Sequence, residues 1–333
     1  MTEPAPILLI GPQPSSDDPI HRLSAALGSP VEVIDDPTDR VRRLIGAPGA
    51  LARRPRLVIV DLDGDPGDPS WSRHQASLEV CASAWARAHT DLPVVLLGDR
   101  RGREELQALL RRDWVSHIVP RSPPERLDEL LMIVRRREAR APEGMPAELI
   151  GQAAGGLSLV VRSSGQKDSA LGEIGAFMER CGVQARVAQA ACVVADEMII
   201  NAVYNAPTGT DGAPLYRSRD RREVVELTEA DAPRLTCACD GTRLALSIRD
   251  RFGSLTPEVL RAAMVRGLEG GQDQIEQKQG GAGLGLYFIL QSATKVIYTL
   301  KPGRATEVVA LFALGGGFRA FAAQPKSFHI FTG

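Results

Sequence analysis

Short apolar runs alternate with amphipathic segments along residues 1–137 of the chain. Five runs have the length and composition of strands buried on both faces, at residues 7–10, 31–34, 57–60, 94–97 and 116–119. Helical periodicity lies between and after them, at residues 20–27, 39–45, 71–89, 102–110 and 124–137. This order predicts an α/β domain over residues 1–137, in which helices cover both faces of a parallel sheet, as in doubly wound folds.

The pattern changes after residue 137. Residues 138–156 contain Pro142, Gly144 and Pro146 and show little periodicity, which is typical of an interdomain linker. A second α/β domain is predicted over residues 157–333, with strands at 157–161, 244–248, 296–300 and 307–314 and helices at 165–180 and 184–204. A polar insert at 207–233 interrupts it, and we expect partner contacts or an elaborated surface there. The apolar tail at 328–331 is expected to dock on its own domain.

Composition narrows the classes of function. With 333 residues, the chain is long enough for two domains that each bury a core. A formal net charge of −1 argues against a nucleic-acid partner, and no apolar run approaches the ~18 residues of a membrane span. We therefore expect a cytoplasmic protein that binds neither nucleic acid nor membrane. The five cysteines follow neither a disulfide pattern nor zinc-ligand spacing, and Cys237 and Cys239 are predicted to be small buried residues.

Glu197, Asn201 and Asn205 stand four residues apart on the otherwise apolar helix at 184–204, so they form one polar stripe. Such a stripe is either a solvated helix face or one wall of a ligand site. In a nucleotide site, the amide oxygen of Asn201 suits Mg²⁺, because Mg²⁺ prefers hard oxygen ligands. Glu197, one turn earlier, could then act as general base on a hydroxyl or water near the terminal phosphate.

A second candidate motif is Asp250-Arg251-Phe252-Gly253, which follows the strand at 244–248. A carboxylate at a strand end can accept a hydrogen bond from the exocyclic amine of adenine, which selects adenine over guanine. Gly253 would let the backbone pass close to the base. The same residues also fit an ordinary turn, and it is their place between the polar stripe and a later glycine-rich run that favours a ligand site.

That run is Gly280-Gly281-Ala282-Gly283-Leu284-Gly285. Its glycines allow backbone amides to turn toward an anion, and the helix predicted to follow adds a favourable dipole. A dinucleotide-binding loop is disfavoured because no strand directly precedes the run, and a Walker P-loop is excluded because Gly-Lys-Ser/Thr is missing. Lys278 is either a phosphate contact or a solvated lysine.

In this order, the three motifs resemble the nucleotide-binding boxes of the GHKL (Bergerat-fold) ATPases, over about residues 156–316. That family includes histidine-kinase catalytic domains and the serine kinases that act as anti-sigma factors. The resemblance implies an α/β sandwich that binds ATP and Mg²⁺, with Glu197 as catalytic base and Asn201 as metal ligand. It also implies a lid at 266–279 and nucleotide contacts from Asn201, Asn205, Asp250, Gly253, Lys278, Gly281, Gly283, Leu284, Gly285 and Thr306. Family members more commonly carry a basic or imidazole side chain where this chain has Asn205.

The five strand–helix units of the first domain resemble a response-regulator receiver domain, with Asp61 at the phosphoacceptor position. The metal and phosphate ligands of a receiver are missing. Gly11-Pro12-Gln13-Pro14 replaces the acidic pair, and the nearest acidic residues, Asp17 and Asp18, lie a few positions further along. Gly98 replaces the hydroxyl residue, and residues 119–121 lack the lysine. Without them, charge on an aspartyl phosphate would be poorly neutralised. We therefore expect a pseudo-receiver that makes protein contacts.

None of the five histidines has the helical context of a histidine-kinase phosphoacceptor. The leading interpretation is a serine/threonine protein kinase resembling the anti-sigma-factor kinases. It would transfer the ATP γ-phosphate to a regulatory protein, such as an anti-sigma-antagonist-like phosphoacceptor. The alternative is a non-catalytic, ATP-dependent interaction switch built on the pseudo-receiver and GHKL domains, and a third reading is a scaffold in which both domains are degenerate. A homodimer is compatible with each reading.

Overall fold

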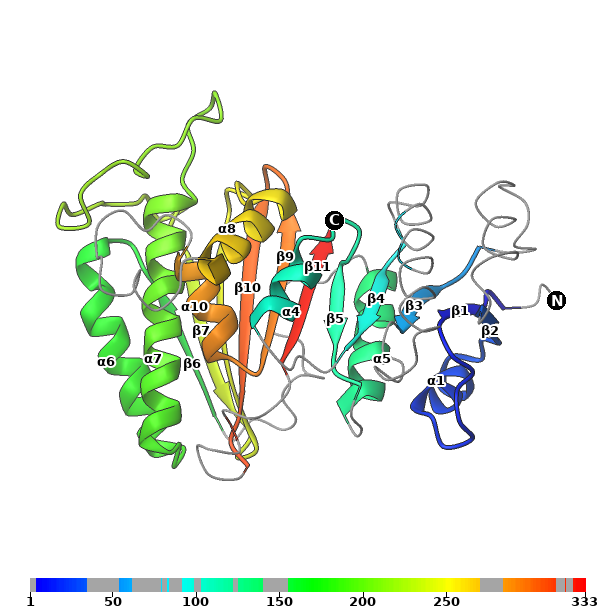
Figure 1. Ribbon diagram of the computed structural model, residues 1–333. Helices are drawn as coiled ribbons and strands as arrows, with labels where there is room; N and C mark the ends of the chain where they lie inside the picture. Colours follow the sequence, from blue (N-terminus) through cyan, green and yellow to red (C-terminus); the bar gives the residue numbers. More distant parts are fainter. Residues whose placement is uncertain are drawn as a thin grey trace. The chain divides into compact units, whose positions relative to one another are not determined.

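The computed structural model describes residues 4–34, 54–61, 79, 83, 92–98, 103–121, 125–139, 155–269, 284–315, 321 and 326–333. The chain divides into two compact units, Met1–Ala139 and Arg140–Gly333. Each unit is α/β, as the apolar pattern predicts (Figure 1). The boundary between the units falls within the predicted linker at 138–156.

The first unit contains a parallel sheet in the order β2-β1-β3-β4-β5. Its strands are β1 (Ile7–Ile10), β2 (Val31–Ile34), β3 (Leu57–Asp61), β4 (Val94–Leu97) and β5 (His117–Val119). All five match predicted strands. β1, β4 and β5 are buried along their whole length, which explains why they are apolar without alternation.

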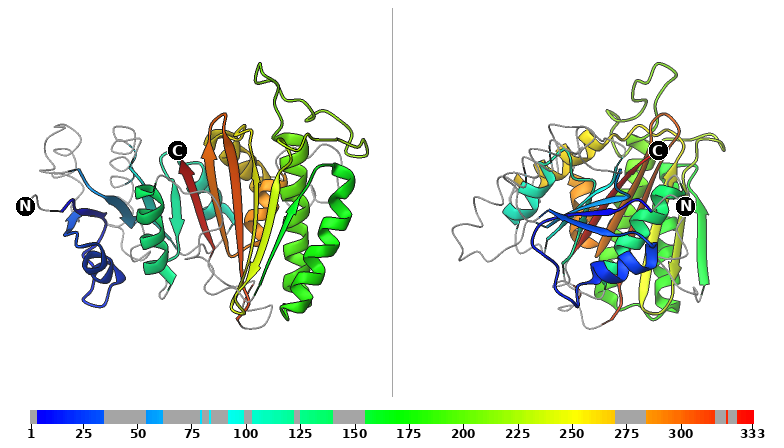
Figure 2. Two further views of the ribbon diagram at one scale, coloured as in Figure 1. Left: turned by 180° about the vertical axis from the view of Figure 1, so that it is seen from behind. Right: turned by 90° about the vertical axis from the view of Figure 1, so that its right-hand side faces the viewer.

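Three described helices accompany this sheet: α1 (Pro19–Leu27), α4 (Arg103–Leu110) and α5 (Glu125–Glu138). α1 packs against α5, and α4 lies on the opposite face of the sheet (Figure 2). All three match predicted helices. The predicted helix at 39–45, and that at 71–89 apart from the helical residues 79 and 83, lie outside the described residues.

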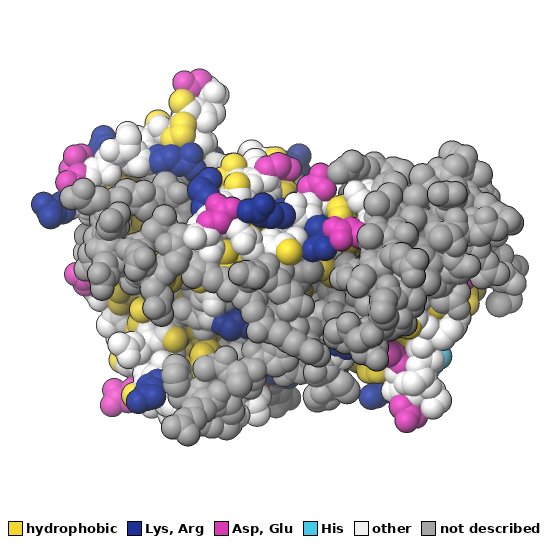
Figure 3. All heavy atoms as spheres, viewed as in Figure 1, with side chains coloured by type: hydrophobic (Ala, Val, Ile, Leu, Met, Phe, Trp, Pro, Cys, Tyr) yellow, Lys and Arg dark blue, Asp and Glu magenta, His cyan; other side chains and the backbone are white. Residues whose placement is uncertain are grey.

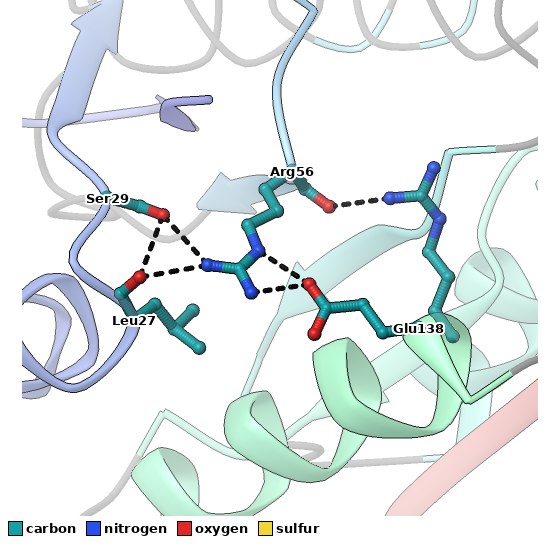
Figure 4. Close-up of polar contacts among 5 residues, drawn as sticks. Leu27, Ser29, Arg56 and Glu138 are labelled. Carbon is teal, nitrogen blue, oxygen red and sulfur yellow. Dashed lines mark hydrogen bonds and ion pairs between the residues drawn. The ribbon is translucent and has the colours of Figure 1, made fainter. Parts of the chain in front are cut away.

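Arg56, just before β3, ties three elements of this unit together (Figure 4). Its Nε donates to Oε1 of Glu138 at 2.6 Å, at the end of α5. One terminal nitrogen donates to the carbonyl of Leu27 at 2.9 Å and to Oγ of Ser29 at 3.2 Å, where α1 ends. Arg137 in turn donates to the Arg56 carbonyl at 3.1 Å. A single guanidinium therefore satisfies acceptors at the ends of two helices.

The second unit contains a mixed sheet in the order β11-β9-β10-β8-β7-β6. Its strands are β6 (Gly155–Val160), β7 (Arg234–Cys239), β8 (Arg243–Asp250), β9 (Lys295–Lys301), β10 (Ala305–Ala313) and β11 (Ser327–Thr332). Neighbouring strands are antiparallel, except that β11 is parallel to β9. Cys237 and Cys239 are buried, as predicted.

The apolar tail forms the strand β11, in which Phe328 and Ile330 are buried. It pairs with β9 from Ser327 to Thr332. The expectation that the tail docks within its own domain is therefore confirmed, and main-chain hydrogen bonds hold it there.

Helices cover one face of this sheet (Figures 1 and 2). They are α6 (Lys167–Arg180), α7 (Ala185–Ile200), α8 (Pro257–Glu269) and α10 (Leu284–Ser292). A π-helical turn, η2 (Asn201–Asn205), continues α7. α10 packs against both α7 and α8, so the end of the glycine-rich run at the start of α10 lies beside the helix that carries the polar stripe.

α7 and η2 together form a helix, Ala185–Asn205, that could cross a membrane by its 21-residue length and its hydropathy of 1.3. Charged residues, among them Asp196 and Glu197, interrupt this helix, so it is not an unbroken apolar run. In the structure, 50% of its most apolar window is buried inside the protein, and Val187, Val194 and Met198 belong to the core. A core helix meets the same criteria, so this segment is weak evidence for a membrane span.

Candidate functional site

A cavity of about 250 Å³ lies between the sheet and helices of the second unit. Its walls come from α7, η2, β8, α8, α10 and β10, and most of its lining is apolar, including Met198, Leu255 and Ile289. Four predicted site residues line it: Asn201, Asn205, Asp250 and Thr306. They come from three segments that lie far apart in the sequence, since Asn201 and Asn205 share one turn, and the fold brings these segments to one cavity.

Asp250 ends β8 and is 7% exposed. Its Oδ1 accepts hydrogen bonds from the backbone N–H of Phe252 at 2.8 Å and of Gly253 at 3.2 Å. Burial raises the pKa of Asp250, and the hydrogen bonds from the N–H groups of Phe252 and Gly253 oppose that rise. Thr306 is the residue opposite Asp250 in the β8–β10 ladder. Asp250 therefore both holds the turn after β8 and presents a carboxyl group to the cavity.

Gly253 has a structural role that the sequence did not indicate. Its φ is +59°, and a Cβ there would lie 2.1 Å from the carbonyl oxygen of Lys301 and 2.8 Å from the nitrogen of Arg304. Gly303 also donates a backbone hydrogen bond to the Gly253 carbonyl at 3.2 Å. Gly253 thus brings the turn after β8 against the β9–β10 hairpin and does not itself line the cavity.

This packing predicts a large difference between two glycine substitutions. Gly253→Ala should lower the free energy of unfolding by roughly 3 kcal/mol or more, because it combines positive-φ strain with a clash against backbone atoms. Gly303→Ala is the matched control, since Gly303 has a φ of +65° and, among the described residues, no atom within 4 Å of the position that a Cβ would take. It should cost only about 1–2 kcal/mol. Urea denaturation of both variants measures the difference, and equal losses would contradict the close packing of Gly253.

The polar stripe is present on α7 and η2. Nδ2 of Asn205 donates to Oδ1 of Asn201 at 2.7 Å. The backbone N–H of Ala206 bonds to the carbonyl of Asn201 at 2.9 Å, five residues back, which defines the π turn. Such turns are frequent at functional sites. Within the described part of the chain, Nδ2 of Asn201 is buried and has no hydrogen-bond partner.

Glu197, one turn before Asn201, is half-buried. Burial is the main cause that raises the pKa of Glu197, and the neighbouring Asp196 raises it further. Arg221 and Lys167 oppose the rise. Lys167 is engaged with Asp196, at 2.7 Å between Nζ and Oδ1. A carboxylate with a raised pKa is a stronger base, which suits proton abstraction.

Gly285 brings the glycine-rich run to this stripe. A Cβ at Gly285 would lie 2.1 Å from Oε2 of Glu197 and 3.6 Å from Nδ2 of Asn201. Any other residue would displace the Glu197 carboxylate, which is the end of a flexible side chain, so the start of α10 lies close against the polar stripe. Leu284 is the first residue of α10. The predicted contacts Lys278, Gly281 and Gly283 lie outside the described residues.

The donor set is suitable for Mg²⁺ held together with a phosphate ligand. Among the described residues, no three His, Cys, Asp or Glu side chains form a metal-binding group. Mg²⁺ nevertheless often uses only one or two protein oxygens and takes its other ligands from phosphates and water. Asn201 offers its amide oxygen, Oδ1, which accepts a hydrogen bond from Nδ2 of Asn205 in this structure.

The sequence did not identify the arginines that lie at this site. Arg217, from the insert at 207–233, and Arg266, from α8, line the cavity. Arg221, also from the insert, donates to Oδ1 of Asn205 at 3.0 Å. Figure 3 shows Lys and Arg side chains beside the base of the projecting loop of the insert. The sequence showed that the insert is rich in arginine, but it did not show where the insert lies in the fold.

A second cavity, of about 180 Å³, lies in the first unit at the carboxyl ends of β1 and β3. Asp61, at the end of β3, forms an ion pair with Arg121. Asp18, which caps α1, forms another with Arg126 at 2.5 Å. Both carboxylates that line this cavity are therefore paired with arginines from the segment that follows β5.

Comparisons with known proteins provide no family assignment. No protein-family model matches the chain, and no curated protein matches it. Among solved structures, a chain in the crystal structure of the SiaB–SiaC complex from Pseudomonas aeruginosa is similar over 55% of this chain and 98% of its own length. The sequence identity is 17% and the TM-score is 0.34. A likeness at that level supports no argument about function.

Proposed function

We propose that the second unit is an ATP-binding domain of the GHKL (Bergerat) type and that the protein is a signalling regulator that phosphorylates a partner protein. One observation carries the proposal. Asn201 and Asn205 of the polar stripe, Asp250 of the second motif and Thr306, which the resemblance implied, line one cavity. The close approach of Gly285 to Glu197 supports it, because the end of the glycine-rich run then lies beside the same stripe. A sheet covered by helices on one face is the sandwich that this fold requires.

Each residue has a defined role in this proposal. The buried carboxyl group of Asp250 accepts a hydrogen bond from the adenine amine, with Thr306 beside it. Asn201 would hold Mg²⁺, which would neutralise charge on the phosphate oxygens. The amides at the start of α10, including those of Leu284 and Gly285, would face the phosphates.

Glu197 is the catalytic base in the proposed transfer. Its carboxylate accepts the proton of a serine or threonine hydroxyl on the partner, and the hydroxyl oxygen forms a bond to the γ-phosphorus. The bond from that phosphorus to the β-phosphate oxygen breaks, and ADP leaves. The raised pKa of Glu197 favours this proton transfer.

Calorimetric titration of the full chain with Mg-ATP tests the proposal. We expect saturable binding. If the folded protein bound no ATP, the kinase proposal would be wrong, and the protein would be a scaffold that does not use a nucleotide.

A second function, an ATP-dependent interaction switch without turnover, is favoured by the neutral side chain of Asn205. No residue of the polar stripe on α7 and η2 is a cation, so the stripe by itself does not neutralise a transferring phosphate. The switch predicts ATP binding with no phosphate transfer to any partner. Incubation with γ-labelled ATP and the partner protein separates the two functions.

We also propose that the first unit is a pseudo-receiver used for protein contacts, because Arg121 and Arg126 already neutralise Asp61 and Asp18. Acetyl phosphate should therefore leave the mass of the intact protein unchanged, whereas a phosphorylatable receiver domain treated in parallel gains one phosphoryl group. A gain of that mass by this protein, lost in Asp61→Asn, would show that Asp61 is a phosphoacceptor and refute the pseudo-receiver.

A further inference from the structure

The polar insert at 207–233 is held against its own unit and forms a defined structure. Ser164 donates a backbone hydrogen bond to the carbonyl of Val225 at 3.0 Å, and Oγ of Ser164 accepts one from the N–H of Val225 at 2.9 Å. Leu227 donates to the carbonyl of Arg162 at 2.8 Å. Val225 itself is buried. The second half of the insert is therefore fixed beside the segment between β6 and α6 (Figure 1).

Tyr204, in the π turn, holds the middle of the insert near the polar stripe. It is 4% exposed, and its hydroxyl lies 2.8 Å from the carbonyl of Glu223 and 3.2 Å from that of Arg221. The backbone of Arg221 is therefore tied to the turn that carries Asn201 and Asn205. A freely moving surface loop would lack this attachment.

The side chain of Arg221 extends back over the same turn. Its guanidinium carbon lies 4.5 Å from the centre of the Tyr204 ring, and one terminal nitrogen donates to Oδ1 of Asn205 at 3.0 Å. Asn205 in turn donates to Asn201, so a chain of hydrogen bonds runs from the insert to the proposed metal ligand. Arg221 and Glu197 also interact electrostatically.

We propose that Arg221 is the phosphate-binding cation of the nucleotide site, supplied by the insert. This inference rests on the proposed ATP-binding function. Arg217 and Arg266 line the cavity, but Glu197, Asn201 and Asn205, beside which the phosphates would lie, carry no positive charge. Arg221 is bonded to this stripe directly, and a bound polyphosphate requires a cation there. A guanidinium has five N–H donors, and the bond to Asn205 uses one of them. The remaining donors match phosphate oxygens, to which arginine binds in a bidentate manner.

The test compares ATP with adenosine as ligands of the full chain in the presence of Mg²⁺, by calorimetry. Arg221→Ala should weaken ATP binding by about tenfold or more and leave adenosine affinity within about twofold, because adenosine has no phosphate. Arg221→Lys keeps the charge and should recover part of the ATP affinity. Arg222→Ala is the matched control, an exposed arginine of the same insert, and should change neither affinity.

Each other outcome overturns the inference in a recognisable way. Unchanged ATP affinity in Arg221→Ala shows that Arg221 does not bind phosphate. An equal loss of affinity for ATP and adenosine shows that Arg221 only supports the structure. The unfolding temperature of the variant should then be lower than that of the wild type. If the wild type bound neither ATP nor adenosine, the proposed ATP site would be wrong, and the inference about Arg221 would fail with it.

Discussion

Replacement of Glu197 by glutamine should lower the rate of phosphate transfer to the partner by about 10²–10⁴-fold, the usual contribution of a general base. Glutamine keeps the shape of the side chain and cannot accept the proton. Mg-ATP affinity should stay within about twofold, because Glu197 does not line the cavity that holds Asp250 and Thr306. The rate is measured with γ-labelled ATP and the affinity by calorimetry. A transfer rate equal to that of the wild type would exclude Glu197 as the base.

The pH dependence of transfer provides an independent check. Because burial and Asp196 raise the pKa of Glu197, the rate should decline with falling pH earlier than for an ordinary glutamate. Asp196→Asn removes one cause of the raised pKa and releases Lys167 from its ion pair, and both changes stabilise ionised Glu197. The acid limb of the profile should therefore move to lower pH in this variant, while the plateau rate remains. A shift in the opposite direction would contradict the assigned electrostatics.

Asp250→Asn should weaken Mg-ATP binding by on the order of 100-fold, because the amide presents a donor where the adenine amine needs an acceptor. The fold should be retained, since Oδ1 of asparagine can still accept from the N–H groups of Phe252 and Gly253. Calorimetry measures the loss of affinity, and circular dichroism verifies the fold. The wild type should also prefer ATP to GTP, because guanine has a carbonyl in place of that amine.

Asp240→Asn is the matched control for this substitution. Asp240 also holds a turn, accepting from the N–H groups of Thr242 and Arg243, but that turn joins β7 and β8 and does not line the cavity. ATP affinity should be unchanged in this variant. Equal affinity in Asp250→Asn and wild type would mean that Asp250 serves only the turn after β8.

Local patterns in the sequence were sufficient to predict most elements and part of the site. The strands at 7–10 and 94–97 are apolar because both of their faces are buried, and that property is visible without knowledge of their neighbours. The stripe of Glu197, Asn201 and Asn205 follows from the helical repeat alone. The glycine-rich run was predicted as a phosphate cradle, and that role stays a prediction; its last glycine, Gly285, lies close to Glu197.

What the sequence by itself determined is therefore the α/β class, the order of the described elements and the polar stripe of Glu197, Asn201 and Asn205, because each depends on residues close together in the chain. Only the tertiary structure decided which distant residues meet. Arg221 reaches Asn205 because Tyr204 and Ser164 hold the insert, and Gly253 packs on the β9–β10 hairpin because β8 pairs with β10. Arg121 faces Asp61 because β3 and β5 both flank β4. Such contacts depend on how separate elements pack, and no periodicity along the chain records that packing.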